Sequence, residues 1–192
     1  MPESHVLPEK PPVLKRKLPP GMPQLAALIL VLLVDSLVAN NFFALHLQDG
    51  RLFGSPIDIL NRAVPVALLA IGMTLVIATG GIDLSVGAIM AIAGATAATL
   101  TVAGHSLPVI ILATLASGVL CGLWNGILVA LLKIQPFVAT LILMVAGRGI
   151  AQLITQGQIV TFDSEALGWI GSGAFALLPV PVWIAAAMAL LV

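Results

Sequence analysis

The sequence predicts an all-α membrane protein, a polytopic bundle of transmembrane helices with five complete helices and a sixth that is cut short. Apolar residues make up 60% of the 192 residues and charged residues only 8%. Soluble domains are about 45–50% apolar and about 25% charged. A chain with so few charged groups cannot cover its own core with polar surface, so lipid is the expected solvent. Apolar runs of about 20 residues, the length that crosses a bilayer, also recur along the chain.

Charge and cysteine content exclude several kinds of function. The formal net charge is zero, so no basic face is expected to neutralise the phosphates of a nucleic acid. Cys121 is the single cysteine, which excludes an internal disulfide and a cysteine-based metal site. No set of nucleophile, base and orienting group can be assembled, and no Walker-type glycine loop is present. The sequence therefore predicts no metal site, no cofactor and no enzymatic activity.

Residues 1–21 are rich in proline and charge, and they are predicted to form a disordered tail. The basic residues Lys15, Arg16 and Lys17 precede the first apolar run, which places the tail in the cytoplasm by the positive-inside rule. The first transmembrane helix is therefore expected at 22–44, running outward. A cleaved signal peptide is the alternative, but the apolar run is too long and no clear small-residue cleavage site follows it.

A polar loop at 45–62 is expected on the outer side. In the next apolar run, from 63 to 104, the only charged residue is Asp83, and this run is twice as long as one span. Gly80 and Gly81 lie in its middle, where glycine commonly ends a helix and aspartate commonly caps the next one. The two helices expected here cover 63–79 and 84–104 and meet near the inner face.

The fourth helix is expected at 108–132, running inward, and Pro136 blocks its continuation. The remaining elements expected are a fifth helix at 137–156, an external loop at 157–177, and a sixth helix that begins near Leu178. The sixth helix is cut off at Val192. Because a spanning helix that stops within the bilayer has no anchor, the transmembrane domain at 22–192 is expected to be incomplete at its C-terminus.

Two of these helices carry small residues every three or four positions, a spacing that lets the backbones of helices approach closely. On the third helix this face consists of Gly87, Ala91, Gly94 and Ala98, and on the fourth helix it consists of Gly118, Gly122 and Gly126. We expect these glycines to serve helix packing, and a direct role in a substrate path is the alternative.

The segment Thr79-Gly80-Gly81-Ile82-Asp83-Leu84-Ser85 interrupts the long apolar run with two glycines, an acid and a hydroxyl. Interrupted helices occur within membranes where they are buried in protein or line a wet cavity, and their ends offer backbone groups to a solute. The alternative interpretation is a turn at the inner face in which Asp83 only caps the following helix.

Four polar side chains lie inside the expected helices. Asp35 and Arg148 would lie at similar depths, so they either form a buried ion pair or face a polar cavity separately. Asn125 and Gln152 are intramembrane amides, for which a hydrogen bond between helices is the expected role. Gln152 lies one turn beyond Arg148 on the same helix face, which favours a shared polar surface.

The run GMTLVIATGGIDLSVGAIMAIAGATAA, from Gly72 to Ala98, resembles the signature region of sugar ABC transporter permeases of the ribose, galactose and arabinose type. The run GLWNGILVALLKIQPFVATLILMVAGRGIAQLIT resembles the same family. The resemblance implies a permease in the bacterial inner membrane that works with a second permease subunit, a cytoplasmic ATP-binding subunit and a periplasmic sugar-binding protein. It also implies several further helices, so the 192 residues alone are not expected to couple to an ATPase.

The leading hypothesis is therefore an import permease for a neutral monosaccharide. Its predicted substrate path consists of Thr79, Gly80, Gly81, Asp83, Ser85, Asn125, Arg148 and Gln152. A secondary transporter that uses Asp35, Asp83 or Arg148 as an ion-coupling group is the second hypothesis. A membrane remnant that transports nothing is the third.

Overall fold

The computed structural model describes residues 21–39, 41–48 and 50–192, and most of these residues are helical. The chain divides into two compact units, residues 1–44 and 45–192, and each is described by itself. The predicted tail at 1–21 lies outside the described residues except for Gly21.

In the first unit, the described residues form the helix α1 (Met22–Val38). The prediction that this helix extends to residue 44 is wrong. Ala39 takes an extended conformation after the last helical turn, and Asn41 takes a left-handed φ of 64°. Asparagine tolerates this conformation better than most residues, so the chain leaves the helix at Ala39 and turns at Asn41.

The second unit begins with a short antiparallel hairpin, β1 (His46–Gln48) and β2 (Arg51–Phe53), and continues into α2 (Ser55–Ala78). The polar loop expected at 45–62 is therefore wrong in part. Helix α2 begins at Ser55 because Pro56 suits the first turn of a helix, and Asp58 in that turn stabilises the positive end of the helix dipole.

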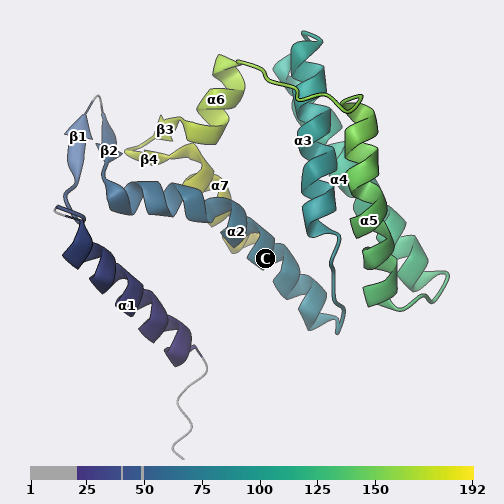
Figure 1. Cartoon of the computed structure of the whole chain (residues 1–192), viewed down its shortest axis with the longest axis horizontal. Coiled ribbons are helices and arrows are strands. Elements are labelled where there is room, and N and C mark those ends of the chain that lie inside the picture. Colours follow the sequence, from purple (N-terminus) through teal and green to yellow (C-terminus); the bar gives the residue numbers. More distant parts are fainter. Residues whose placement is uncertain (1–20, 40, 49) are drawn as a thin grey trace, which may run out of the picture. The chain divides into compact units, whose positions relative to one another are not determined.

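Three helices form a bundle, namely α3 (Val86–Val102), α4 (Leu107–Ala130) and α5 (Pro136–Ile154) (Figure 1). These bounds confirm the third, fourth and fifth predicted helices to within two residues at each end. Helix α3 packs against both α5 and α4. The buried residues of α3 are Ala88, Ile92, Ala95 and Ala98, and those of α5 are Ala139, Thr140, Leu143 and Gly147.

The segment expected as an external loop at 157–177 contains regular structure. Helix α6 (Glu165–Ser172) begins after Ser164, whose side-chain hydroxyl accepts a hydrogen bond from the Leu167 amide at 3.5 Å. A small hairpin of β3 (Ala174–Phe175) and β4 (Leu178–Pro179) follows, and α7 (Val180–Leu191) packs against α2. The serine cap is a local sequence signal for this helix, and the low apolar content of the segment hid it.

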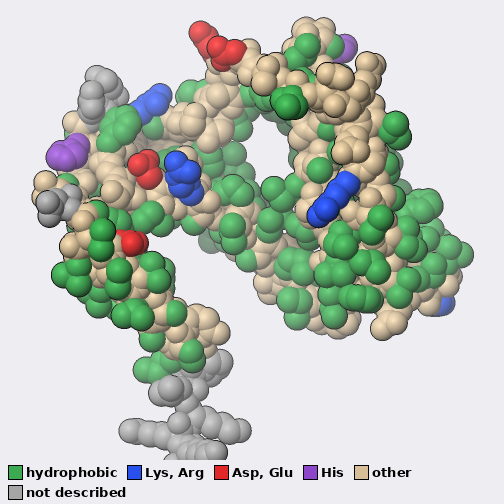
Figure 2. Space-filling view, viewed as in Figure 1, with side chains coloured by type: hydrophobic (Ala, Val, Ile, Leu, Met, Phe, Trp, Pro, Cys, Tyr) green, Lys and Arg blue, Asp and Glu red, His purple; other side chains and the backbone are tan. Residues whose placement is uncertain are grey.

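Among the described residues, three helices are long and apolar enough to cross a membrane: α2, α4 and α5. Helices α1, α3 and α7 are apolar but shorter, so five complete spans plus a sixth remain a prediction. Hydrophobic side chains cover much of the surface that Figure 2 shows, and charged side chains are sparse on it. On α4, which is 24 residues long, only Ile110, Asn125 and Leu128 are buried. An apolar surface of this kind is the one that lipid or further helices cover.

Candidate functional site

The break between α2 and α3 lies where the two glycines predicted it. Thr79 follows the last helical residue of α2, and Gly80 adopts a left-handed φ of 75°. The Gly81 amide donates a hydrogen bond back to the Val76 carbonyl at 3.1 Å. This is the arrangement in which glycine commonly ends a helix. The chain then continues without helical structure from 81 to 85 before α3 begins.

Asp83, Ser85 and Asn125 form a hydrogen-bonded chain at this break. Asp83 Oδ1 accepts from the Ser85 amide at 2.7 Å and from the Ser85 hydroxyl at 2.6 Å. Asn125 Nδ2, from α4, donates to Ser85 Oγ at 2.9 Å. The single proton of the hydroxyl points to the carboxylate, so the amide of Asn125 must act as the donor. The sequence proposed all three residues, and the structure brings them together.

This geometry corrects one part of the second interpretation of Asp83, and the choice between a turn at the inner face and a break that lines a cavity stays a prediction. Ser85 occupies the N-cap position of α3, so the proposal that Asp83 caps this helix itself is wrong. The carboxylate instead fixes the conformation of the residues before the helix, through the amide and hydroxyl of Ser85.

Thr140 on α5 is a residue of this cluster that sequence reasoning missed. Its Oγ1 accepts a hydrogen bond from the Leu84 amide at 3.2 Å, and it lies 3.3 Å from the Ile82 carbonyl. A threonine inside a helix usually bonds a carbonyl of its own helix, as Thr140 also does with Pro136 at 2.9 Å. The sequence around Thr140 carries no signal of the second contact, which depends on how α5 packs against the break.

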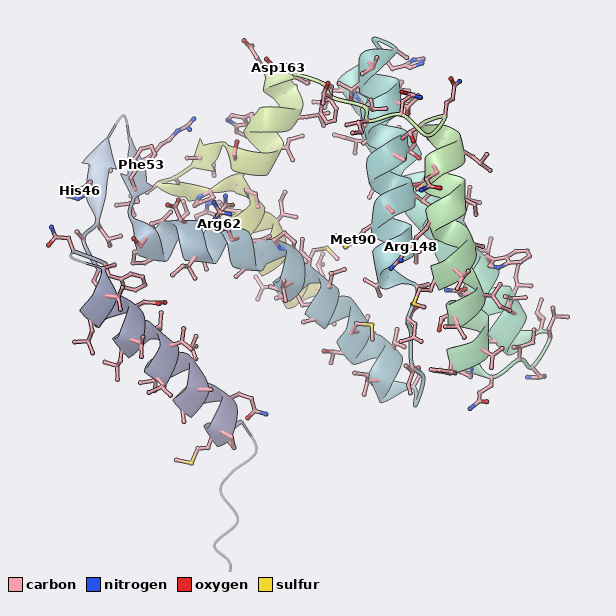
Figure 3. The ribbon with its side chains drawn as sticks, viewed as in Figure 1. His46, Phe53, Arg62, Met90, Arg148 and Asp163 are labelled. Carbon is pink, nitrogen blue, oxygen red and sulfur yellow. The ribbon has the colours of Figure 1, made fainter. Side chains whose placement is uncertain are left out.

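The predicted path residues separate into a buried and an exposed group. Ser85 is 0% and Asn125 is 8% exposed, so both contact protein groups rather than a solute in this conformation. Thr79, Arg148 and Gln152 are exposed, and Asp83 is half-buried. Figure 3 shows Arg148 about midway along the helical bundle.

An open groove of about 320 Å³ lies between α3 and α5. Its walls come from small residues of α3, from Ala151, Gln152 and Thr155 near the end of α5, and from Val160. The residues of α3 in the groove are Ala91, Gly94, Ala95 and Ala98. Gln152 therefore places an amide beside a surface of small side chains, where a solute can approach the helix backbones.

The glycines expected to serve helix packing do not contact neighbouring helices closely within the described residues. No atom lies within 4 Å of the position that a Cβ would take at Gly87, Gly94, Gly122 or Gly126, and at Gly118 the nearest atom is Ile89 Cγ2 at 4.0 Å. The close approach occurs at Gly147 of α5, where a Cβ would lie 2.7 Å from Ala88 Cβ. The packing role of the predicted glycines stays a prediction.

The ion pair between Asp35 and Arg148 also stays a prediction, because Asp35 belongs to the first unit and Arg148 to the second. If Arg148 faces a solute path instead, we expect the variants Asp35→Leu and Arg148→Leu to change the folded yield by independent amounts. If the two charges form a buried pair, each single variant should lower the folded yield strongly, since breaking a buried ion pair costs about 3–5 kcal/mol.

The yields of both single variants and of the double variant, measured by size-exclusion chromatography in detergent, distinguish these cases. Additive changes support separate surroundings for the two charges. A double variant that folds better than either single variant would contradict them and support the pair.

The described residues contain no group of three or more histidine, cysteine, aspartate or glutamate side chains that could hold a metal ion. What the structure offers a solute is neutral or singly charged, namely the carboxylate of Asp83, the guanidinium of Arg148 and the amide of Gln152. Such groups can form hydrogen bonds with hydroxyls along a path.

A bundle of apolar helices, interrupted by a polar break that neighbouring helices hold in place, defines a helical membrane protein. The comparisons with known proteins identify which kind. The chain belongs to the family described as branched-chain amino acid transport system / permease component, which matches residues 55–192.

Its relatives include several sugar permeases. The galactofuranose transporter permease protein YtfT of Escherichia coli is 77% identical over 167 residues, which is 87% of this chain and 49% of the relative. The fructose import permease protein FruF of Bifidobacterium longum is 39% identical over 88% of this chain and 49% of the relative. The ribose import permease protein RbsC of Escherichia coli is 38% identical over 83% of this chain and 49% of the relative.

The chain thus spans about half the length of these curated relatives. No solved structure matches it significantly. The resemblance to sugar permeases that the run from Gly72 to Ala98 indicated is confirmed.

Proposed function

We propose that this chain is part of a permease subunit of an ATP-driven sugar importer, which passes a neutral monosaccharide, galactofuranose in particular, across the bacterial inner membrane. The observation that carries the proposal is the 77% identity to a galactofuranose transporter permease over 167 residues. The break between α2 and α3 lies within the region that the permease family matches, so it belongs to the part of the chain that the family shares.

The exposed polar residues are the proposed contacts of the sugar. Thr79, Arg148 and Gln152 offer a hydroxyl, a guanidinium and an amide, and a neutral sugar needs such partners for its own hydroxyls. The groove beside Gln152 is lined mainly by alanine and glycine, so it can admit a ring without large side chains in the way. Ser85 and Asn125 support this path from the buried side.

The proposed architecture places the tail at 1–21 in the cytoplasm, followed by a transmembrane permease domain at 22–192 with five complete helices and a sixth. Helices α1 and α3 have 17 residues each, at the lower end of the length that spans a bilayer. The proposed partners are a second permease subunit, a cytoplasmic ATP-binding subunit that carries out ATP hydrolysis, a periplasmic sugar-binding protein and the surrounding lipid.

Uptake of labelled galactose tests this function in bacteria that lack the gene containing this sequence, compared with the same bacteria carrying it on a plasmid. In a host strain that lacks other galactose transporters, we expect saturable uptake of submicromolar sugar with the gene and only background uptake without it. The rate should fall to background when ATP is depleted and should persist when a protonophore collapses the proton gradient while ATP is maintained.

Uptake that stops with the proton gradient and survives ATP depletion would contradict the proposal and favour a secondary transporter. Equal uptake with and without the gene, at a matched level of the protein in the membrane, would contradict both. Fructose and ribose serve as competitors in the same assay, and stronger competition by either than by galactose would overturn the choice of sugar.

A further inference from the structure

Side chains from two helices form hydrogen bonds with the non-helical segment at the α2–α3 break. From α5, Thr140 Oγ1 accepts a hydrogen bond from the Leu84 amide at 3.2 Å and lies 3.3 Å from the Ile82 carbonyl. From α4, Asn125 Nδ2 donates to Ser85 Oγ at 2.9 Å. Thr140 and Asn125 are 5% and 8% exposed, so both contacts are shielded from solvent.

These contacts supply hydrogen-bond partners to the backbone and side chains of the break. Between α2 and α3 the amides and carbonyls lack the partners that a continuous helix would supply, and an unpaired backbone group is costly away from water. The Thr140 hydroxyl supplies a partner for the Leu84 amide, and the Ser85 side chain is held from both sides. The segment 82–85 is therefore fixed to the α3–α5 bundle by side chains more than 35 positions away in the sequence.

The carboxylate of Asp83 is the group that this arrangement orients. Both of its hydrogen bonds from described residues use Oδ1, and both donors belong to Ser85. The other oxygen, Oδ2, takes no part in these bonds, and the Asp83 side chain is half-buried rather than enclosed. A carboxylate held by one oxygen presents the second oxygen in a fixed direction.

We propose that Thr140 and Asn125 are positioning residues, which hold segment 82–85 so that Asp83 presents Oδ2 as a hydrogen-bond acceptor to a hydroxyl of the transported sugar. The part of this inference that concerns the sugar rests on the proposed function. The clamp, by which we mean the hydrogen bonds of Thr140 and Asn125 to segment 82–85, does not rest on it. Thr140 and Asn125 act through Ser85 and the backbone and do not touch the sugar. Loss of either hydrogen bond loosens the segment and weakens binding of the sugar by the carboxylate.

The first arm of the test measures the clamp without transport. Cys121 is the single cysteine of the sequence, so Cys121→Ser followed by Leu84→Cys gives the chain one reporter thiol at a half-buried position. Thr140→Val removes the hydroxyl at nearly constant shape. We expect it to raise the rate of maleimide labelling at position 84 about two- to tenfold, the factor for one lost hydrogen bond, while Thr140→Ser keeps the wild-type rate.

Two controls separate a local effect from general unfolding. Thr114→Val makes the same chemical change on α4, where the one partner of the Thr114 hydroxyl among the described residues is the Ile110 carbonyl of its own helix. It should leave labelling at position 84 unchanged. A second reporter, Leu100→Cys on α3, should label equally in the wild type and in Thr140→Val. Unchanged labelling at position 84 in Thr140→Val, or an equal rise at both reporters, would overturn the clamp.

The second arm measures sugar uptake by the transporter that contains this chain, with its native cysteine. Thr140→Val and Asn125→Ala should raise KM for the sugar about two- to tenfold with little change in the maximal rate at equal expression, and Thr140→Ser should restore the wild-type KM. Raised labelling with an unchanged KM would overturn the role of Asp83 and leave the clamp. Absence of uptake in the wild type would refute the proposed function and the role of Asp83 together, while the labelling arm still decides the clamp.

Discussion

Replacing Gly147 with alanine is expected to weaken the packing of α5 against α3 by about 1–3 kcal/mol, the usual cost of an added methyl group in a packed core. The added Cβ would lie 2.7 Å from Ala88 Cβ and 3.4 Å from Ile92 Cδ1. Carbon atoms of this kind meet favourably at about 3.5–4.0 Å, so the two helices must separate. Both Ala88 and Gly147 are buried in the bundle, so neither residue can move away from the other without displacing its neighbours.

Gly149→Ala is the matched control, since it makes the same change two residues away in the same helix. No atom lies within 4 Å of the position its Cβ would take, so only the gain in helix propensity acts there, about 1 kcal/mol in favour of the variant. Unfolding of the purified chain by SDS titration in detergent gives both values.

A second substitution at Ala88 should compensate for the methyl group added at position 147. Ala88→Gly removes the opposing methyl group, so the double variant Gly147→Ala, Ala88→Gly should regain most of the stability that Gly147→Ala loses. Equal stability of Gly147→Ala and Gly149→Ala would show that α3 and α5 do not approach as closely as the structure places them.

Replacing Ser85 with alanine has the second large expected effect, a loss of about 1–3 kcal/mol of unfolding free energy, because it leaves a buried amide unpaired. Ser85 is 0% exposed, and its hydroxyl both donates to Asp83 and accepts from Asn125. Asn125 Oδ1 already has no hydrogen-bond partner among the described residues. In the variant, Asn125 Nδ2 would lose its acceptor too, and the side chain would be a polar group in an apolar core.

The double variant Ser85→Ala, Asn125→Leu tests this explanation, since removing both partners of a hydrogen bond is far less costly than removing one. It should be more stable than Ser85→Ala alone. Ser117→Ala serves as the control, because the one partner of the Ser117 hydroxyl among the described residues is the Thr114 carbonyl one turn earlier in α4. This variant should change stability by less than about 0.5 kcal/mol. A double variant less stable than Ser85→Ala would refute the role of Ser85 as the partner of Asn125.

Local signals in the sequence predicted much of the fold. The third to fifth helices were placed to within two residues because apolar runs, Pro108, Pro136 and the glycine pair mark their ends. The prediction was poorest where helices extend beyond the apolar run or stop before its end. Helix α2 begins among polar residues at Ser55, and α1 ends at Val38, before the apolar residues Phe42, Phe43 and Ala44.

For the candidate site, composition predicted the residue types and the structure decided their partners. Asp83, Ser85 and Asn125 stood out as rare polar groups in apolar runs, and they do contact one another. Thr140 did not stand out, because a threonine in a helix can satisfy its hydroxyl within its own helix. Gly147 did not stand out either, since one glycine carries no periodic pattern, whereas the regular glycines of α3 and α4 do.

The sequence by itself determined that the protein is helical and membrane-bound, that the chain breaks at Gly80 and Gly81, and which permease family it belongs to. The first two properties follow from composition and local backbone preference, which act over neighbouring residues, and the family follows from the resemblance carried by the run from Gly72 to Ala98. Only the tertiary structure decided that Thr140 and Asn125 hold the break, and that Gly147 rather than the regular glycines brings two helices together. Such contacts join residues about 40 to 60 positions apart, and they depend on the rotation of each helix about its axis, which no local pattern specifies.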